Sequence, residues 1–496
     1  MYFLGIDLGS SSIKLAVLDA NTGKSVASSS VPDQEMRIDA PQSGWAEQHP
    51  EKWWEYTCNG IKKLGNQGID LKQIKAIGIS YQMHGLVLTD KDLNVLRPSI
   101  IWCDSRAASI GEKYYQEKGA SFFQDRVLQS PGNFTSSKLK WVQENEPQLF
   151  DQIAHMMLPG DYLAAKFSGV AQTSKSGLSE AALWDFKKNA LAEEVLEALD
   201  LPRAVIPEIV ANFSHQATIA PKIAEALGLS KNVEITYRAG DQPNNALALN
   251  VNKPGEIATT AGTSAVIYSV TDQDAFDAKN RINTFLHVNN TEAQKRNGVL
   301  LCINGSGILY QWLRKMLSTG KDELLSYDFL NAQAAKVGPG SDGLHFYPFG
   351  NGVERIFNNK KSFSGLQNLD FNRHAATHMV RAACEGIVYA MNYGFEVMQQ
   401  IGAGGTSVKA TKANLFLSPV FREIFVNTTQ TSLELYETNG AEGAARGAAY
   451  GYGFYKSLDE AAQGLELLST QEPQSALKEH YTNLYQTWKK NIQILD

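Results

Sequence analysis

Closely spaced cysteines are absent from this sequence. Its 496 residues include four cysteines, and no two of them form a C-x-x-C pair: Cys58, Cys103, Cys302 and Cys384. Cysteines scattered in this way are typical of reduced, mostly structural thiols rather than of a disulfide framework. They lead us to expect a cytoplasmic protein.

Long hydrophobic runs and an excess of positive charge are absent as well. No apolar run approaches the roughly 18 residues of a membrane-spanning helix. We expect no secretory signal, because the N-terminus enters an apolar strand pattern without a basic region. The formal net charge is −6, which gives no electrostatic reason to expect nucleic acid or an anionic membrane as a partner. We therefore expect no nucleic acid and no membrane among the partners.

The chain does have the composition of a globular α/β protein with two domains. Apolar residues make up 43% of it and charged residues 20%, as in soluble globular proteins. A chain of this length is too long for one core. Strand and helix patterns alternate, and Pro254-Gly255 marks a boundary. We predict an N-terminal domain over residues 1–248 and a C-terminal domain over residues 249–496.

The first informative segment is a predicted hairpin at the N-terminus. Apolar residues 2–6 lead to Asp7 at a predicted strand end, and a second apolar run over residues 13–18 returns. The Gly and Ser residues of the turn have short side chains, so backbone N–H groups can approach a phosphate. A carboxylate at the strand end can hold Mg²⁺, directly or through water. An ordinary glycine-containing hairpin is the alternative. The residues assigned to phosphate binding are Asp7, Gly9, Ser10, Ser11, Ser12 and Lys14.

A second hairpin of the same kind follows about half a chain later. Residues 257–268 contain two apolar runs joined by Gly262, Thr263 and Ser264, which we also assign to phosphate binding. Neither hairpin contains GxxxxGK[ST] or GxGxxG, which excludes a P-loop or dinucleotide-binding fold at this site. The spacing indicates an internal duplication. The pattern resembles the actin-like ATPases, and it implies two ribonuclease H-like domains with a nucleotide and sugar cleft between them.

Two helices are expected in the second half of the chain. Residues 381–400 form a long apolar-periodic segment, and residues 442–455 are rich in Ala and Gly. The small side chains of the second segment would allow close packing against a neighbour or a nucleotide.

Further motifs carry a family resemblance that spans nearly the whole chain. They include Gln82-Met83-His84-Gly85 and Ala239-Gly240-Asp241-Gln242, besides the N-terminal hairpin. In these motifs and their order the chain resembles the FGGY carbohydrate kinases, and within them the xylulokinases most closely. The matching blocks are dense in the first half and thinner in the second: residues 5–11, 45–54, 82–85, 97–106, 134–143, 158–163, 239–242, 262–264 and 384–386.

The resemblance implies an ATP-dependent sugar kinase. Asp241 matches the family's catalytic aspartate, which accepts the proton of the attacking hydroxyl, and Asp7 matches the aspartate that holds Mg²⁺ and phosphate. We assign Asp7 and Asp241 as metal-binding residues and ATP and Mg²⁺ as cofactors. The expected reaction transfers the γ-phosphoryl group to the terminal hydroxyl of D-xylulose, giving D-xylulose 5-phosphate. Dimers are common in the family, which leaves a homodimer open.

The same resemblance assigns a sugar site to Met83, His84, Asp241 and Gln242. A histidine can hydrogen-bond a sugar hydroxyl, and a methionine can supply an apolar wall; a core Met and a surface His are the alternative. Asp104 and Arg106 are expected to form a structural ion pair. Trp45 and Glu47 either line the pocket mouth or pack in the interior.

Three segments depart from the family pattern. Pro243-Asn244-Asn245 follows the catalytic motif where small residues are usual, and residues 411–419 replace a Gly-rich turn that lies against adenine. Residues 352–356 match a Gly-Glu-Arg-Thr-Pro motif only in part. These departures leave open a kinase for another ketose or polyol, such as ribulose, fuculose or glycerol. They also leave open a family member that binds sugar or nucleotide with impaired catalysis.

Overall fold

The computed structural model describes residues 1–357, 360–361 and 363–492, and it has a mixed α/β fold. The chain divides into two compact units that are not continuous in sequence. The first unit contains Met1–Asn252, Phe285–Asn297 and Thr438–Leu465, and the second contains Lys253–Thr284, Gly298–Glu437 and the segment that begins at Glu466. The division of the sequence at residues 248 and 249 stays a prediction.

The first unit is built on a six-stranded sheet in the order β13-β14-β5-β1-β2-β3. Strand β1 runs antiparallel to β2 and parallel to β5, and β14 runs parallel to β5. The hairpin predicted at the N-terminus is confirmed, because β1 and β2 flank the turn at residues 9–12. The strands are β1 (Tyr2–Leu8), β2 (Ile13–Asp19), β3 (Lys24–Val31), β5 (Ile74–Tyr81), β13 (Phe213–Thr218) and β14 (Glu234–Gly240).

The second unit repeats this strand order when its sheet is read from the β25 edge, with β17 as an additional strand at the other edge. Its seven-stranded sheet runs β17-β18-β16-β15-β23-β24-β25. Strand β15 is antiparallel to β16 and parallel to β23, as β1 is to β2 and β5. The predicted duplication of the hairpin is therefore confirmed at the level of topology. The strands are β15 (Glu256–Ala261), β16 (Ala265–Thr271), β17 (Asn283–Leu286), β18 (Asn297–Ile303), β23 (Ser407–Thr411), β24 (Ser432–Glu437) and β25 (Glu466–Gln471).

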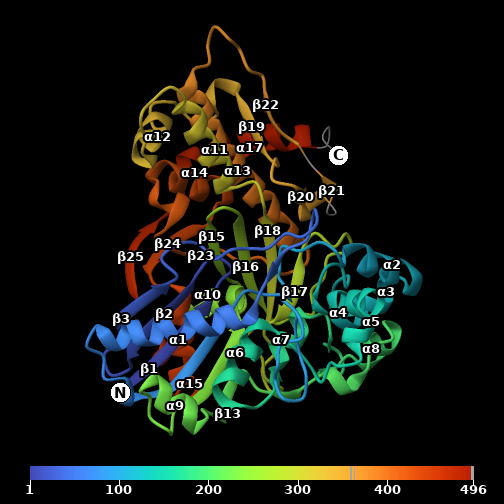
Figure 1. Ribbon diagram of the computed structural model, residues 1–496. Helices are drawn as coiled ribbons and strands as arrows, with labels where there is room; N and C mark the ends of the chain where they lie inside the picture. The colour runs from blue at the N-terminus through green and yellow to red at the C-terminus, as the bar shows by residue number, and fades with distance from the viewer. Residues whose placement is uncertain (358–359, 362, 493–496) are drawn as a thin grey trace. The chain divides into compact units, whose positions relative to one another are not determined.

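Helix α15 (Gly440–Gly451) packs directly on the first sheet, across β1 and β5. In Figure 1 this orange-red helix lies with the blue N-terminal strands. A Cβ atom on Gly5 of β1 would lie 1.8 Å from the Ala441 carbonyl oxygen, and one on Gly78 of β5 would lie 2.0 Å from that of Ala444. The expected close packing of the Ala/Gly-rich helix is confirmed, and its neighbour is the sheet.

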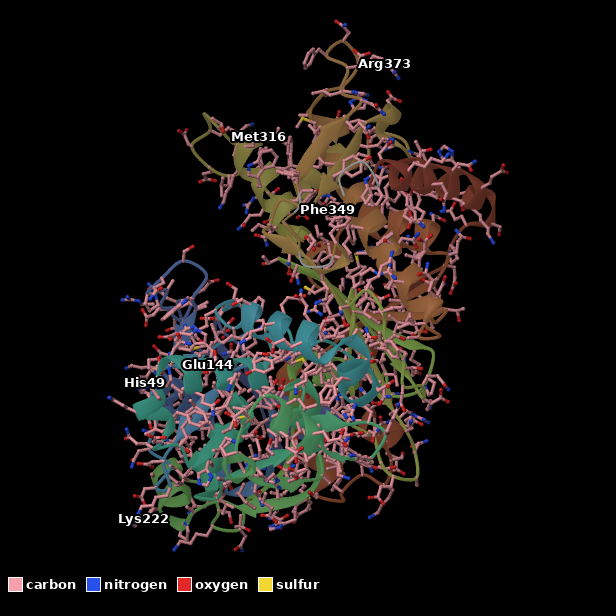
Figure 2. The ribbon with its side chains drawn as sticks, turned by 90° about the vertical axis from the view of Figure 1, so that its right-hand side faces the viewer. His49, Glu144, Lys222, Met316, Phe349 and Arg373 are labelled. Carbon is pink, nitrogen blue, oxygen red and sulfur yellow. The ribbon has the colours of Figure 1, made fainter. Side chains whose placement is uncertain are left out.

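Five further helices of the first unit carry or support the residues of interest: α1 (Pro50–Asn66), α4 (Thr135–Asn145), α6 (Pro159–Ser168), α7 (Lys175–Glu180) and α10 (Asp241–Ala248). Pro50 occupies the first position of α1, where a missing N–H costs nothing, and His49 caps the helix by accepting from the N–H of Glu51. Figure 2 labels His49 at this helix start. Helix α10 begins directly where β14 ends.

The core of the second unit surrounds the long helix α13 (Ala376–Gln400). Phe349, labelled in Figure 2, is fully buried there, with its ring 4.8 Å from that of Phe357 and 6.2 Å from that of Trp488. The main helices of this unit are α11 (Gly307–Leu317), α12 (Tyr327–Ala334), α14 (Pro419–Thr429) and α17 (Lys478–Ile492). Among the described residues, no helix combines the length and the apolarity needed to cross a membrane.

Candidate active site

Asp7 lies at the end of β1, beside the ends of two neighbouring strands. Its Oδ1 accepts a 2.7 Å hydrogen bond from the Ser80 hydroxyl of β5, and Lys14 pairs with it across the β1–β2 ladder. Burial raises the pKa of Asp7, although the hydrogen bond from Ser80 and the charge of Lys14 lower it. Sequence reasoning did not assign Ser80. The position of Ser80 at the end of a neighbouring predicted strand is the signal that could have identified it.

The turn after β1 is held by its own backbone and by two neighbouring side chains. The Gly9 N–H donates to the Ser12 carbonyl at 3.1 Å. Gln48 donates to the Ser10 carbonyl at 2.7 Å, and the Trp102 indole N–H lies 3.4 Å from the Ser10 hydroxyl. These bonds fix the shape of the turn, with Ser11 exposed to solvent at its tip.

Asp241 is the first residue of α10 and follows β14 without a linker. The Gln242 side chain donates a 3.0 Å hydrogen bond to Asp241 Oδ2. Burial, and then the charge of Asp7, raise the pKa of Asp241 to about 7, even though the side chain and backbone of Gln242 lower it. Asp7, although far from Asp241 in sequence, is therefore close enough to oppose the ionisation of Asp241. The expected sugar contact of Gln242 stays a prediction.

The residues after Gln242 pack α10 against α15. Pro243 occupies the first turn of α10, where proline is tolerated, and it is buried. The Asn244 amide donates a 2.8 Å hydrogen bond to the carbonyl of Gly440, the first residue of α15. A Cβ on Gly440 would lie 2.5 Å from Asp7 Oδ2, so a larger residue there would displace the carboxylate. The departure at residues 243–245 thus supports the helix that adjoins Asp7.

Met83 and Glu180 meet at Gly240, the residue before Asp241. A Cβ on Gly240 would lie 2.5 Å from Met83 Cγ and 2.6 Å from Glu180 Oε2. Met83 is 5% exposed and Glu180 is 1% exposed. Burial, and then the charge of Asp241, raise the pKa of the Glu180 carboxyl well above its usual range. Met83 is thus both well buried and adjacent to the Asp241 segment. No pattern in the sequence points to Glu180.

His84 adopts a left-handed backbone conformation with φ 63°. Its Nδ1 lies 3.1 Å from the Glu180 carbonyl, which can only accept, so Nδ1 carries the proton. The ring lies edge-on to Phe134, with centroids 4.8 Å apart, and 5.5 Å from the ring of Phe285. His84 is half-buried. The structure therefore brings Met83, His84 and the Asp241 segment together around Glu180.

Asp104 and Arg106 form the expected ion pair. The Arg106 guanidinium lies 2.6 Å from Asp104 Oδ2 and 2.8 Å from Glu47, and all three side chains are buried. Trp45 stacks on the same guanidinium, with Cζ 3.7 Å from the ring centroid. Cation–π stacking and a desolvated ion pair are packing roles. The structure favours the interior role for Trp45 and Glu47.

The second predicted phosphate turn lies at the start of α11. Gly307, the first residue of this helix, donates to the Gly262 carbonyl at 2.9 Å, and Ile308 donates to the Thr263 carbonyl at 3.1 Å. The loop before α11 is held in turn by Glu354, whose carboxylate accepts from the N–H groups of residues 304 and 305, both at 3.0 Å. Thr263 is exposed to solvent.

The segment that replaces the Gly-rich turn contributes one left-handed residue. Asn414 has φ 53° and lies beside Gly262, where a Cβ on the glycine would be 3.4 Å from the Asn414 amide nitrogen. Asparagine tolerates this backbone region better than most residues. Leu415 and Phe416 are buried in the core of the second unit. Their side chains therefore pack inward from this turn.

Comparison with known proteins decides the family. Residues 2–248 match the N-terminal domain of the FGGY family of carbohydrate kinases, and residues 257–452 match its C-terminal domain. The chain belongs to the FGGY family. It is accordingly a phosphotransferase that acts on a sugar hydroxyl, with the actin-like ATPase fold of this family.

Individual FGGY relatives differ in the acceptor that their names give. The xylulose kinase of Escherichia coli (strain K12) is 30% identical over 454 residues, covering 90% of this chain and 88% of its own length. A ligand-bound xylulose kinase from Lactobacillus acidophilus has a TM-score of 0.90 at 22% identity, and a gluconate kinase from the same organism has 0.89 at 23%. Both alignments cover 100% of this chain and 98% of the other. The shared fold alone does not identify the sugar.

Proposed function

We propose that this FGGY kinase phosphorylates a ketopentose with ATP, and that D-xylulose is its principal acceptor, giving D-xylulose 5-phosphate. The observation that carries the proposal is the position of Asp241, which feels the charge of Asp7 and follows Gly240, the residue that adjoins Met83 and Glu180. His84 is bonded in turn to the carbonyl of Glu180. The 30% identity to the xylulose kinase of Escherichia coli supports the choice of sugar.

In this proposal Asp241 acts as the general base. Its carboxylate accepts the proton of the terminal sugar hydroxyl as that oxygen attacks the γ-phosphorus, and the bond to the leaving ADP oxygen breaks. A base works best when its pKa lies near the working pH, and burial, with the charge of Asp7, raises the pKa of Asp241 to about 7. The hydrogen bond from Gln242 would fix the rotation of the carboxylate toward the acceptor.

Met83 and His84 would bind the acceptor. Both side chains adjoin the segment that carries the base, because Met83 lies against Gly240 and His84 is bonded to the carbonyl of Glu180. The imidazole would hydrogen-bond a sugar hydroxyl and the thioether would form an apolar wall. His84→Ala should therefore raise the KM for the sugar more than it lowers kcat.

Asp7 and Asp241 fit a magnesium ion. Both offer carboxylate oxygens, and a cation would offset the charge of Asp7, which adds to the effect of burial in raising the pKa of Asp241. Mg²⁺ in kinases is usually held by one or two carboxylates, with phosphate and water completing its shell. Among the described residues, no group of three or more His, Cys, Asp or Glu side chains forms a metal site. Bound there, the ion would neutralise charge on the transferred phosphoryl group.

A protein that binds sugar or nucleotide without catalysis is the second candidate. The observation that favours it is the segment at residues 411–419, where Asn414, Leu415 and Phe416 stand in place of the family's Gly-rich turn. Against it, Asp7 and Asp241 are both present, and Asn414 has the left-handed backbone that a glycine also adopts readily.

A sugar panel with coupled detection of ADP separates these candidates. Its members are D-xylulose, D-ribulose, L-ribulose, L-xylulose, L-fuculose and glycerol, and D-xylulose should give the highest kcat/KM. An unpaired buried hydroxyl costs about 1–3 kcal/mol, so one mismatch shifts preference roughly 10- to 100-fold. Another sugar whose kcat/KM exceeds that of D-xylulose tenfold would overturn only the choice of acceptor. No release of ADP with any sugar would favour the second candidate.

A further inference from the structure

Lys138 is a fully buried lysine whose amino group contacts the backbone of the acceptor segment. It lies on α4, and its side chain is 0% exposed. The Nζ atom donates to the His84 carbonyl at 2.8 Å and to the Ile101 carbonyl at 3.0 Å. Lys138 therefore joins two chain segments, one of which carries the imidazole proposed to bind sugar.

The His84 backbone needs such support. Its φ of 63° places it in the left-handed region, where a non-glycine residue typically costs on the order of 1–3 kcal/mol unless its surroundings hold it. The Lys138 amino group donates a hydrogen bond to the carbonyl of this residue, and the Glu180 carbonyl accepts one from its Nδ1. Because the two bonds act on the backbone and on the ring, they determine both the path of the chain and the direction of the imidazole.

Burial of the amino group is itself unfavourable. Burial lowers the pKa of Lys138 to about 7, while the charge of Asp104 opposes the shift. A charged group is expensive to remove from water unless it is hydrogen-bonded. The neutral amine still has two N–H donors, enough for both carbonyls. The contacts can therefore persist whichever protonation state the amine has.

We propose that Lys138 is a positioning residue of the acceptor site, which fixes the backbone at His84 and so holds the imidazole where the sugar binds. This inference rests on the proposed function, because His84 has to contact the sugar. It predicts that Lys138 acts on the affinity for the sugar and only through His84. A lysine that merely stabilised the fold would not depend on the His84 side chain.

The test is a double-mutant cycle on the full chain, with Lys138→Met, His84→Ala and the double variant. We expect Lys138→Met to raise the KM for D-xylulose about 10-fold or more, as loss of a hydrogen bond from a charged group would. The kcat and the KM for Mg-ATP should stay within about threefold. In the His84→Ala background the same substitution should change the sugar KM by less than about threefold.

Lys140→Met is the matched control. Lys140 lies on the same helix, is 6% exposed, and donates to Gln143 at 2.6 Å. Its loss should leave the sugar KM unchanged. Equal effects of Lys138→Met in both backgrounds, or equal effects of the two lysine variants, would overturn the inference. Should Lys138→Met fail to fold, Lys138→Gln replaces it in the cycle with the same expected outcomes, since its side chain is one atom shorter and cannot keep the bonds to both carbonyls.

Failure of the proposed function would be visible separately. If the wild-type chain releases no ADP with any sugar, the kinase proposal fails, and the cycle is then measured as dissociation constants for D-xylulose by calorimetry. A non-additive loss of affinity in that measurement still supports Lys138 as a positioning residue. Additive losses, or no binding by the wild type, overturn it.

Discussion

At Asp241, folding places a carboxyl group where its charged form is disfavoured. Burial and the neighbouring charge of Asp7 both oppose ionisation, and the hydrogen bonds from Gln242 offset them only in part. A carboxylate that is difficult to ionise is also a stronger base, which is what proton abstraction from a hydroxyl requires. The burial and the charge of Asp7 that disfavour the ionised form of Asp241 therefore also make its carboxylate a stronger base.

This residue predicts the acid limb of the pH profile. Asp241 must be ionised to accept a proton, and its pKa is raised to about 7 in the free protein. We expect kcat/KM to rise with pH, about tenfold per unit below 7, and to level off above it, because kcat/KM reports the free enzyme. The measurement is the initial rate from pH 5 to pH 9 with D-xylulose and Mg-ATP both well below their KM values, where the rate reports the free enzyme. A profile that is flat down to pH 5 would mean that the base has the pKa of an ordinary carboxyl group.

At the scale of the element, α15 and the first sheet depend on each other's small residues. The backbones approach so closely at Gly5 and Gly78 that neither position has room for a Cβ. Ala445 and Ala448 of α15 pack with Phe3 and Leu18 of the sheet. Because Gly440 at the start of this helix lies against Asp7, the packing of the element also positions a residue of the site.

We therefore expect Gly78→Ala to destabilise the protein. The new methyl group would lie 2.0 Å from the Ala444 carbonyl oxygen, a backbone atom that cannot move aside alone. Overpacking of this kind costs about 1–3 kcal/mol, occasionally more. Urea unfolding measures it, and Gly338→Ala is the control, since a Cβ there has nothing within 4 Å. Equal free energies of unfolding for the two variants would show that α15 does not pack as described.

Both hairpins could be predicted from the sequence because their signals are local. An apolar run, a Gly and hydroxyl turn and a second apolar run lie within a few residues of one another, and the strands β1, β2, β15 and β16 confirm them. The bond from Ser80 to Asp7 depends instead on which strands become neighbours, and only the sheet order supplies this. The roles of Lys138 and Glu180 arise from contacts between distant helices and loops, which leave no pattern in the sequence.

At the scale of the whole molecule, the first unit uses chain from both ends. Residues 438–465, which include α15, belong to the same compact unit as residues 1–252. The hydrophobic cluster around Phe3, Leu18 and Ala76 is completed by residues of that C-terminal segment. Residues 2–248, which match the N-terminal domain of the family, therefore lack part of the surface that covers their own sheet.

We expect a fragment of residues 1–252 not to fold cooperatively by itself. Without α15 the sheet would expose to water the face on which Gly5 and Gly78, which have no side chains, allow the helix to pack closely. Near-ultraviolet circular dichroism and urea titration of the fragment, with the full chain as reference, test this. A sharp unfolding transition of the fragment alone would contradict the shared construction of the first unit.

The central claim is that Asp241 accepts the proton of a ketose hydroxyl, and Asp241→Ala tests it most directly. The measurement is kcat at saturating D-xylulose and Mg-ATP, accompanied by the calorimetric dissociation constant for the sugar. Loss of a general base should lower kcat on the order of 10²–10⁴-fold, while sugar binding survives through Met83 and His84. Turnover close to that of the wild type, in a variant that binds the sugar normally, would contradict the account.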